Sequence, residues 1–335
     1  MIPQSNAAVI FTDWQQELAN CISDPSELLR RLGLDKQLEA LDAQALKAFP
    51  LRVTESYLNK MQYGDIADPL LRQVFPLTDE GIPAEGYMMD PVGDHQAVSN
   101  PGVLQKYQGR ALLLTTGACA IHCRYCFRRH FPYSNSNPLA SQWQETLAAL
   151  RADISISEVI LSGGDPLALS DLKLGNMIND LSSIPHVKRL RIHTRLPLVL
   201  PKRITNKLLA SLKETRLRVV MVIHANHGNE IDTETVKVLS QLREVGCDLL
   251  NQAVLLKGVN DDAETLISLS ERLHEAAVLP YYLHLLDKVQ GAQHFDVSQL
   301  QGEQLIATMR AALPGYLVPR LVREIAGESS KTIIV

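Results

Sequence analysis

The sequence lacks an excess of charge of one sign, and it lacks any long hydrophobic run. It has 335 residues, of which 33 are Lys or Arg and 37 are Asp or Glu, so its formal net charge is −4. This balance gives no reason to expect nucleic acid or an anionic membrane as a partner. No apolar run reaches the roughly 18 residues of a membrane-spanning helix. The first residues also lack the basic start and apolar core of a secretory signal, so we expect a cytoplasmic protein with no membrane contact.

Cysteine is scarce, and its distribution is uneven. Three of the five cysteines, Cys119, Cys123 and Cys126, lie in the segment GACAIHCRYCFRRHF at residues 117–131. An odd number of cysteines, three of them this close together, does not indicate a disulfide framework. Reduced thiols in a cluster instead indicate metal or redox chemistry.

The spacing C-x3-C-x2-C is compatible with more than one kind of site. Zinc usually takes four protein ligands in a structural site, and His122 or His130 could supply the fourth. A [4Fe–4S] cluster held by three thiolates would leave one iron open, and that iron could bind the amino and carboxylate groups of a small molecule. Three inert buried thiols are a third interpretation, but the interleaved His, Arg and Tyr residues argue against an apolar core.

From about residue 110, short apolar runs alternate with helical patterns, which predicts parallel βαβ units. Six such units indicate a partial (β/α)6 barrel or a doubly wound sheet. We expect three regions: an N-terminal helical extension (1–95), the repeats (96–300), and a C-terminal helix and tail (301–335). Residues 76–106 are rich in Gly, Pro and Asp and are predicted to form an irregular connection. The six predicted strands are residues 111–116, 158–164, 187–194, 218–224, 248–256 and 281–286.

The unusual motifs follow successive predicted strands. The cysteine segment follows the first strand, SGGDP follows the second, and HANH and NQ lie at or near the ends of later strands. The loops at the carboxyl ends of parallel barrel strands build the active site. We therefore expect these motifs to meet on one face.

The cysteine segment resembles the signature of the radical S-adenosylmethionine (SAM) enzymes, C-x3-C-x-aromatic-C, with Tyr125 as the aromatic residue. The resemblance implies that Cys119, Cys123 and Cys126 hold a [4Fe–4S] cluster whose open iron binds SAM. SGGD at residues 162–165 resembles the glycine-rich strand end that contacts the SAM amino group in these enzymes.

A longer series of motifs includes DPLLRQV, GRALLLTTGACAIHCRYCFRRHF, LSGGDPLALSD, LPLVLPKRIT, NHGNEI, NQAVLLKGVND, PYYLHLLD and SSKT. In these motifs the sequence resembles the lysine 2,3-aminomutase family. It is most similar to the short bacterial form that supplies β-lysine for modification of elongation factor P. The resemblance implies a partial (β/α)6 barrel of radical SAM type whose C-terminal tail closes the site, and transfer of an amino group from C2 to C3 of free L-lysine.

The resemblance also implies pyridoxal 5′-phosphate (PLP) as a cofactor, with Lys331 of GESSKT as the lysine that attaches it. Lys106 stands where the family has an arginine, which keeps the charge but loses the bidentate fork. The other residues that match positions near PLP and its phosphate are Arg110, Gln252 and Tyr107.

For SAM, the implied contacts are Gly163, Gly164 and Asp165 at the amino group, Tyr125 against the adenine, and His224. Glycine allows a ligand to approach the backbone closely. A histidine that only makes structural hydrogen bonds at a strand end is an alternative for His224.

For the substrate, Arg128 matches the residue that binds the α-carboxylate. Asp287 and Glu324 match the two acids that hold the ε-ammonium of lysine. Longer family members have aspartate at the position of Glu324, and they carry additional C-terminal cysteines that bind zinc. This sequence has no such cysteines after Lys331, so we predict no zinc. Arg124 and Arg129 receive no role.

The resemblance further implies a protein reductant and a functional link to the ligase that modifies elongation factor P. Two other interpretations stay open. One is an aminomutase for another amino acid, such as arginine, although paired acids would repel glutamate. The other is an iron–sulfur protein without catalysis, against which Lys331, Arg110 and Arg128 together argue.

Overall fold

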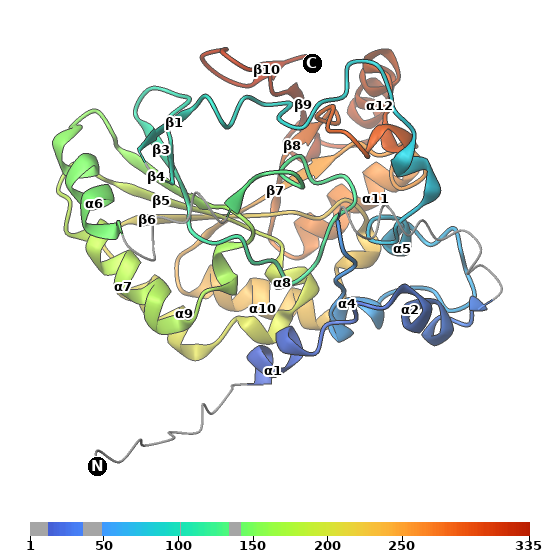
Figure 1. Ribbon diagram of the computed structural model, residues 1–335, viewed down its shortest axis with the longest axis horizontal. Coiled ribbons are helices and arrows are strands. Elements are labelled where there is room, and N and C mark those ends of the chain that lie inside the picture. The colour runs from blue at the N-terminus through green and yellow to red at the C-terminus, as the bar shows by residue number, and fades with distance from the viewer. Residues whose placement is uncertain (1–12, 36–48, 101, 134–141) are drawn as a thin grey trace.

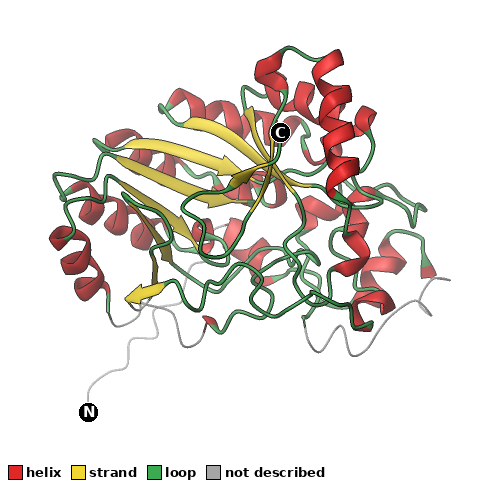
Figure 2. Cartoon of the chain, turned by 90° about the horizontal axis from the view of Figure 1, so that it is seen from above, coloured by secondary structure: helices red, strands yellow, loops and turns green. Residues whose placement is uncertain are grey.

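The computed structural model describes residues 13–35, 49–100, 102–133 and 142–335. In these ranges ten strands form one sheet, and their order in space follows their order in the sequence. Strands β3 to β9 run parallel, with antiparallel β1 and β2 at one edge and antiparallel β10 at the other. The described sheet is thus an open, partial barrel (Figures 1 and 2). The strands are β1 (Val98–Asn100), β2 (Val103–Leu104), β3 (Arg110–Leu114), β4 (Glu158–Ser162), β5 (Arg189–Thr194), β6 (Arg218–Ile223), β7 (Asp248–Val254), β8 (Leu279–His284), β9 (Arg320–Arg323) and β10 (Thr332–Ile333).

All six predicted strands are confirmed, as β3 to β8, and the partial barrel is confirmed with them. Their residues alternate between the two faces of the sheet. In β7, for example, fully buried and half-buried positions follow one another along the whole strand. This period of two places one set of side chains against the helices and the other set on the opposite face.

The longer helices cover one side of the sheet, and the C-terminal segment with β10 lies across the other (Figure 1). Side chains cap the first turns of several of them; for example, Asp232 accepts a hydrogen bond from the backbone N–H of Thr235. Gly246 follows the end of that helix with φ +94°, a conformation that favours glycine. These helices are α6 (Trp143–Ala152), α7 (Asp171–Ser182), α9 (Asn206–Glu214), α10 (Thr233–Glu244), α11 (Ala263–Glu275) and α12 (Gln299–Ala312).

The N-terminal extension contains helices, as predicted, but those in the described residues are short and are joined by loops. Asp24 caps α2, because its side chain accepts a hydrogen bond from the backbone N–H of Ser26. The connection at 76–106 is less irregular than predicted, because it contains the two antiparallel strands β1 and β2. The regional boundaries near residues 95 and 300 stay predictions. The helices are α1 (Asp13–Ala19), α2 (Pro25–Arg31), α4 (Glu55–Leu58), α5 (Pro69–Arg72) and the 3-10 helix η2 (Thr78–Gly81).

The C-terminal tail joins the sheet, which the sequence did not predict. Strand β9 pairs in parallel with β8, and β10 folds back antiparallel on β9, so that Thr332 lies opposite Arg323. This hairpin brings the segment before β10 next to the residues that follow β9. Strand β9 has only two buried apolar residues between two arginines, so its sequence carries little strand signal.

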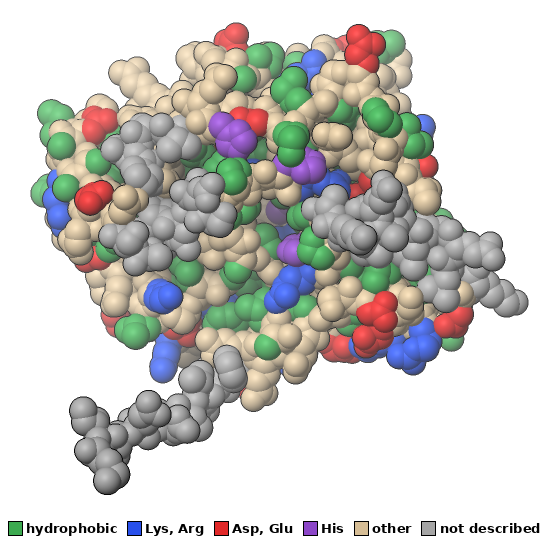
Figure 3. All heavy atoms as spheres, in the orientation of Figure 1, with side chains coloured by type: hydrophobic (Ala, Val, Ile, Leu, Met, Phe, Trp, Pro, Cys, Tyr) green, Lys and Arg blue, Asp and Glu red, His purple; other side chains and the backbone are tan. Residues whose placement is uncertain are grey.

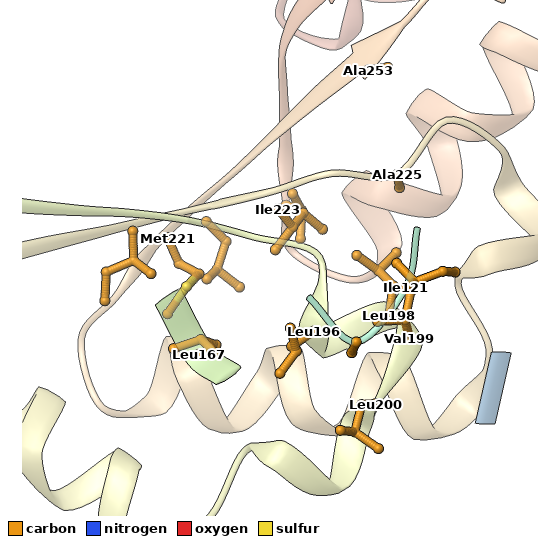
Figure 4. Packing of buried hydrophobic residues seen from close by; sticks show 14 of the residues in the cluster. Ile121, Leu167, Leu196, Leu198, Val199, Leu200, Met221, Ile223, Ala225 and Ala253 are labelled. Atoms are coloured by element: carbon orange, nitrogen blue, oxygen red, sulfur yellow. The ribbon is translucent and has the colours of Figure 1, made fainter. Parts of the chain in front are cut away.

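Buried apolar side chains support the loops at the carboxyl ends of the strands. Ile121 of the cysteine segment belongs to the same buried cluster as Leu198 and Val199 of the short helix α8 (Leu196–Val199), as Figure 4 shows. Leu167, after the SGGD motif, and Met221 of β6 lie in this cluster as well. Among the described residues, no helix has the length and apolarity needed to cross a membrane.

Candidate active site

The cysteine segment follows β3 and is fixed by backbone hydrogen bonds on two sides. The Cys126 N–H donates to the Cys123 carbonyl at 3.0 Å, which closes a turn between these two residues. The N–H groups of His122 and Arg124 donate to the carbonyls of Arg52 and Gln73, at 3.0 and 2.9 Å. The N-terminal extension therefore holds the loop from outside the barrel.

The SGGD motif holds the same loop from the barrel side. The Gly164 N–H donates to the Thr116 carbonyl at 2.6 Å, and the Asp165 N–H donates to the Ala118 carbonyl at 2.8 Å. A β-carbon on Gly164 would lie 2.3 Å from the Ala118 carbonyl oxygen, and Gly163 has φ +128°. Both glycines are needed because the cysteine loop passes directly against them.

The three cysteines are partly exposed, and their thiols lie close enough to affect one another. Burial raises the pKa of Cys119 well above its usual value, and the charges of Cys126 and Cys123 contribute to the rise. Burial raises the pKa of Cys126 to about 11. In the described ranges, no three His, Cys, Asp or Glu side chains converge on a point that could hold one metal ion. Three accessible thiols on one loop, within electrostatic reach of one another, fit a [4Fe–4S] cluster, which binds each thiolate through a separate iron.

Arg195, directly after β5, contacts one of these thiols. Its Nη1 donates to Cys123 Sγ at 2.7 Å, and its Nη2 lies 2.8 Å from Glu230 Oε2. Burial opposes the charge of Arg195, but Cys123 and Glu230 outweigh burial and hold its pKa well above the usual value. Arg195 therefore stays a cation beside the cysteine loop.

Tyr125 and His224, both predicted to contact SAM, lie together. Their rings stack with centroids 5.7 Å apart, and the Tyr125 hydroxyl is 3.2 Å from His224 Nε2. Asn226 Nδ2 donates to the same hydroxyl at 2.7 Å. Burial lowers the pKa of His224 to about 3, with a further contribution from Arg195, so the imidazole is neutral.

Asp165, the acid of SGGD, is buried, and the neighbouring strand end supplies its partners. Its carboxylate accepts hydrogen bonds from the Thr194 hydroxyl at 2.7 and 2.9 Å and from the Arg195 N–H at 2.7 Å. Burial raises its pKa to about 6, against these hydrogen bonds. Asp165 thus ties the end of β4 to the end of β5, in addition to any contact with SAM.

Arg128 points its guanidinium toward two side chains from distant parts of the chain. Its Nε donates to Asp94 Oδ2 at 2.6 Å, and its Nη1 donates to Ser162 Oγ at 2.9 Å. Lys106 Nζ lies 2.6 Å from Asp94 Oδ1. Burial opposes ionisation of Asp94, but Arg128 and Lys106 outweigh it, so the pKa of Asp94 is lower than usual. Asp94 fixes both cations in one place.

Glu324 joins Lys331 to this group. Lys331 Nζ lies 2.5 Å from Glu324 Oε2, and the Tyr107 hydroxyl donates to Glu324 Oε1 at 2.6 Å. Lys106 Nζ is 3.7 Å from the same Oε1 atom. Charges of alternating sign therefore run without a break from Lys331 through Glu324, Lys106 and Asp94 to Arg128.

Asp287 borders this series but differs from Glu324. Burial raises the pKa of Asp287 to about 7 and the charge of Glu324 contributes, although the nearby Lys331 and Lys106 act in the opposite direction. Glu324 has a pKa below its usual value, because Lys331 and Tyr107 outweigh its burial. One acid is therefore only partly ionised near neutral pH, and the other is a carboxylate.

Two of the residues predicted to lie near PLP have polar groups available. Among the described residues, the side chains of Arg110 and Gln252 form no hydrogen bond or ion pair, although the Arg110 guanidinium lies 5.3 Å from the Tyr107 ring centroid. A free guanidinium and a free amide are suitable donors for a phosphate. Lys106 and Tyr107, in contrast, are engaged with acids.

Histidines line the same region. Burial lowers the pKa of His193 and of His284 well below the usual value, and the charge of Lys331 adds to both shifts. Figure 3 shows histidine side chains in and around the hollowed centre of this face. The interior near Lys331 is thus lined by neutral imidazoles.

Comparisons with known proteins show the family of the chain. A family model described as the radical SAM superfamily matches residues 113–269. The L-lysine 2,3-aminomutase of Escherichia coli (strain K12) is 48% identical over 321 residues, which cover 96% of this chain and 94% of that protein. The chain belongs to the lysine 2,3-aminomutase family.

Other aminomutases of the family are similar over most of their length. The L-lysine 2,3-aminomutase of Haemophilus influenzae is 47% identical over 99% of this chain and 98% of that protein. That of Clostridium subterminale is 34% identical over 97% of this chain and 78% of that protein. Among solved structures, a radical SAM methyltransferase from Sphaerobacter thermophilus has a TM-score of 0.46 at 15% identity, covering 66% of this chain and 68% of that chain.

Membership of the aminomutase family carries the predicted cofactors with it: a [4Fe–4S] cluster, SAM and PLP. The structure groups the corresponding residues at the carboxyl ends of the strands and at the C-terminal hairpin. The cysteine loop, the SGGD turn, Tyr125 and His224 form one group. Arg128, Asp287, Glu324 and Lys331 lie in or beside the charged series. The individual roles of these residues stay predictions.

Sequence reasoning missed three residues that organise this aminomutase site: Asp94, Arg195 and Glu80. Glu80 is buried and pairs with both arginines that had no role, since Arg124 Nη2 and Arg129 Nη2 lie 2.6 and 2.7 Å from its Oε2. Each of the three residues meets partners that are distant in sequence. Of the three, Arg195 had a signal in the sequence, because it directly precedes the stretch LPLVLPKRIT that matches the family. Its partner Glu230 lies in another matching stretch, NHGNEI.

Proposed function

We propose that this chain is a lysine 2,3-aminomutase that moves the α-amino group of free L-lysine to C3 and releases β-lysine. The observation that carries the proposal is the 2.5 Å ion pair between Lys331 Nζ and Glu324 Oε2. The Lys331 side chain ends in the same alkylammonium group as the substrate. Its contact supports Glu324, with Asp287 nearby, as a site for an ammonium ion.

The opposite end of the substrate would lie at Arg128. Asp94 and Ser162 hold its Nε and Nη1, which orients the guanidinium and leaves Nη2 to bind a carboxylate. Lys106, between Asp94 and Glu324, links the carboxylate end to the ammonium end. A substrate with both a free α-carboxylate and a side-chain ammonium would satisfy both ends.

The chain's other residues position and protect the reaction. When bound, the cluster with SAM supplies the carbon radical that removes hydrogen from C3, and PLP carries the migrating nitrogen. Lys331 attaches PLP, and Arg110 with Gln252 offers donors to its phosphate. The half-buried His193, His224 and His284 keep neutral imidazoles in the interior, and the C-terminal hairpin covers it, which limits access of water to a radical.

The reaction would need an electron donor and a consumer for its product. We place the protein in the cytoplasm, with a protein reductant that delivers the electron to the cluster. Its β-lysine would serve the ligase that modifies elongation factor P. Free lysine is the expected substrate even so, because lysine within a polypeptide has neither the free α-amine nor the free carboxylate that Lys331-bound PLP and Arg128 require.

A panel of substrates tests the assignment. The reconstituted protein, with SAM, PLP and a reductant under anaerobic conditions, is given L-lysine, L-arginine, L-glutamate, Nα-acetyl-L-lysine or a lysine-containing peptide. We expect a β-amino acid from L-lysine and none from L-glutamate, the acetylated lysine or the peptide. Faster turnover of L-arginine than of L-lysine would assign a different amino acid to the site, and turnover of the peptide would contradict the role of Arg128.

A further inference from the structure

Arg195 is a buried cation that donates a hydrogen bond to a cysteine of the cluster loop. It is 6% exposed, and its Nη1 lies 2.7 Å from Cys123 Sγ. We propose that Arg195, together with Glu230, is a positioning residue that sets the reduction potential of the cluster. The inference rests on the proposed function only in taking Cys123 as a cluster ligand.

Glu230, whose charge balances that of Arg195, is also fixed by hydrogen bonds. Glu230 is 0% exposed, and its Oε2 accepts from Arg195 Nη2 at 2.8 Å. Its Oε1 accepts from the backbone N–H groups of Asn226 and His227, at 2.8 and 3.1 Å. These bonds keep the carboxylate on the side of the guanidinium away from Cys123. The charge of Arg195 therefore lies between the Cys123 sulfur and the charge of Glu230.

The N-terminal extension completes this arrangement. Gln73 directly follows α5. Its Oε1 accepts hydrogen bonds from Arg195 Nη2 at 2.5 Å, from the Tyr125 hydroxyl at 3.2 Å and from Asn226 Nδ2 at 3.0 Å. The Tyr57 hydroxyl of α4 lies 3.1 Å from the same Nη2 atom. Arg195 is thus fixed by two parts of the chain and cannot turn away from the thiolate without losing several hydrogen bonds.

The position of Arg195 predicts the direction in which it shifts the reduction potential of the cluster. Reduction adds one negative charge to a cluster, and hydrogen bonds to its sulfur ligands stabilise the reduced form. A fixed cation in an interior of low dielectric constant acts more strongly than one in water. Arg195 should therefore raise the reduction potential of the cluster, and Glu230, as its counter-charge, should lower it.

A purely structural role of Arg195 would give a different result in the variants. If Arg195 served only to pair with Glu230, removing either partner would disturb the loop, and both variants would lose cluster without opposite effects on the potential. The electrostatic role predicts shifts of opposite sign. Substitutions that keep the side-chain size make this difference measurable, namely R195M, R195K and E230Q.

The experiment is a redox titration of the reconstituted cluster, followed by electron paramagnetic resonance without SAM or lysine. In R195M we expect the ratio of reduced to oxidised cluster at a fixed potential to fall about tenfold or more, since a hydrogen bond to a charged group is lost. Tenfold corresponds to 59 mV for one electron. E230Q should shift the potential upward. R195K, which keeps a positive charge, should shift the potential downward by less than R195M does.

The matched control is D248N, which removes an exposed acid paired with Arg218 and should leave the potential unchanged. Iron and sulfide content and circular dichroism check that each variant holds its cluster and its fold. If R195M fails to hold the cluster, R195K and E230Q decide the question. Unchanged potentials in these variants, or shifts in the same direction, would overturn the proposal. Because no substrate is present, that result is independent of whether the protein makes β-lysine.

Discussion

Asp287 and Glu324 show how two acids assigned to the same ligand differ in their electrostatics. Lys331 and Tyr107 keep Glu324 ionised, whereas burial raises the pKa of Asp287 to about 7. The charges that act on Asp287 come from Lys331, Glu324, Lys106 and Asp94. Near neutral pH, the charge available to a substrate ammonium therefore depends on the protonation of one residue.

This difference predicts how lysine binding depends on pH. Below pH 7 Asp287 is mostly protonated and attracts no cation, and above pH 7 it is mostly a carboxylate. We expect the affinity of the PLP-free protein, in which Lys331 keeps its charge, for lysine to rise roughly tenfold between pH 6 and pH 8, because binding favours the ionised form. Titration calorimetry at pH 6, 7 and 8 measures it.

Two variants separate the acids. In D287N the affinity should be lower and should lose most of this dependence on pH. In E324Q the affinity should be lower, and its rise should begin at a lower pH than in the wild-type protein, because the charge of Glu324 contributes to the raised pKa of Asp287. A slope in D287N equal to that of the wild-type protein would show that another group titrates.

At the scale of the elements, the site depends on how closely two βα loops approach each other. The loop after β3 carries the cysteines, and the turn after β4 carries the two glycines that face it. A β-carbon at residue 164 would meet the backbone of Ala118, which cannot move aside as a flexible side chain could. The glycines are therefore required by the fold as well as by any ligand.

We expect G164A to displace the cysteine loop and to cost about 1–3 kcal/mol of stability, as overpacking does in a close-packed interior. The reconstituted variant should hold much less iron per chain than the wild-type protein. G315A is the matched control, because nothing lies within 4 Å of a β-carbon at that position. Full iron content in G164A would mean that the loop does not approach the glycine as closely as the structure shows.

Glu80 joins the N-terminal extension to the cysteine loop through Arg124 and Arg129. Removing one partner from a buried ion pair leaves uncompensated charge, so E80Q should lower the free energy of unfolding by about 3–5 kcal/mol. E55Q, which breaks the exposed pair with Arg31, should cost at most about 1 kcal/mol. Urea denaturation of the cluster-free proteins measures both, and equal losses would contradict the role of Glu80.

The sequence predicted those elements whose signal is local. Strands β3 to β8 have clear apolar runs, and the cysteine spacing is a complete motif in itself. Strand β9 was missed because Arg320 and Arg323 flank two apolar residues. Asp94 and Arg195 were missed because their importance comes from partners that only the folded chain brings near, such as Arg128 and Cys123.

At the scale of the whole molecule, three regions of the chain contribute to one interior. The N-terminal extension supplies Gln73 and Glu80 behind the cysteine loop, the barrel supplies the loops, and the C-terminal hairpin supplies Glu324 and Lys331. The charged series from Lys331 to Arg128 crosses from the last of these regions to the barrel. We therefore expect activity to require all three regions of the chain.

The most direct test of the central claim is to follow the nitrogen. L-lysine labelled with ¹⁵N at the α-amine is incubated anaerobically with the reconstituted protein, SAM, PLP and a reductant, and the product is analysed by mass spectrometry and nuclear magnetic resonance. We predict β-lysine with ¹⁵N at C3, and no β-lysine from K331A. If the wild-type protein, with cluster and PLP shown to be bound, forms no β-lysine, or forms it with unlabelled nitrogen at C3, the claim is contradicted.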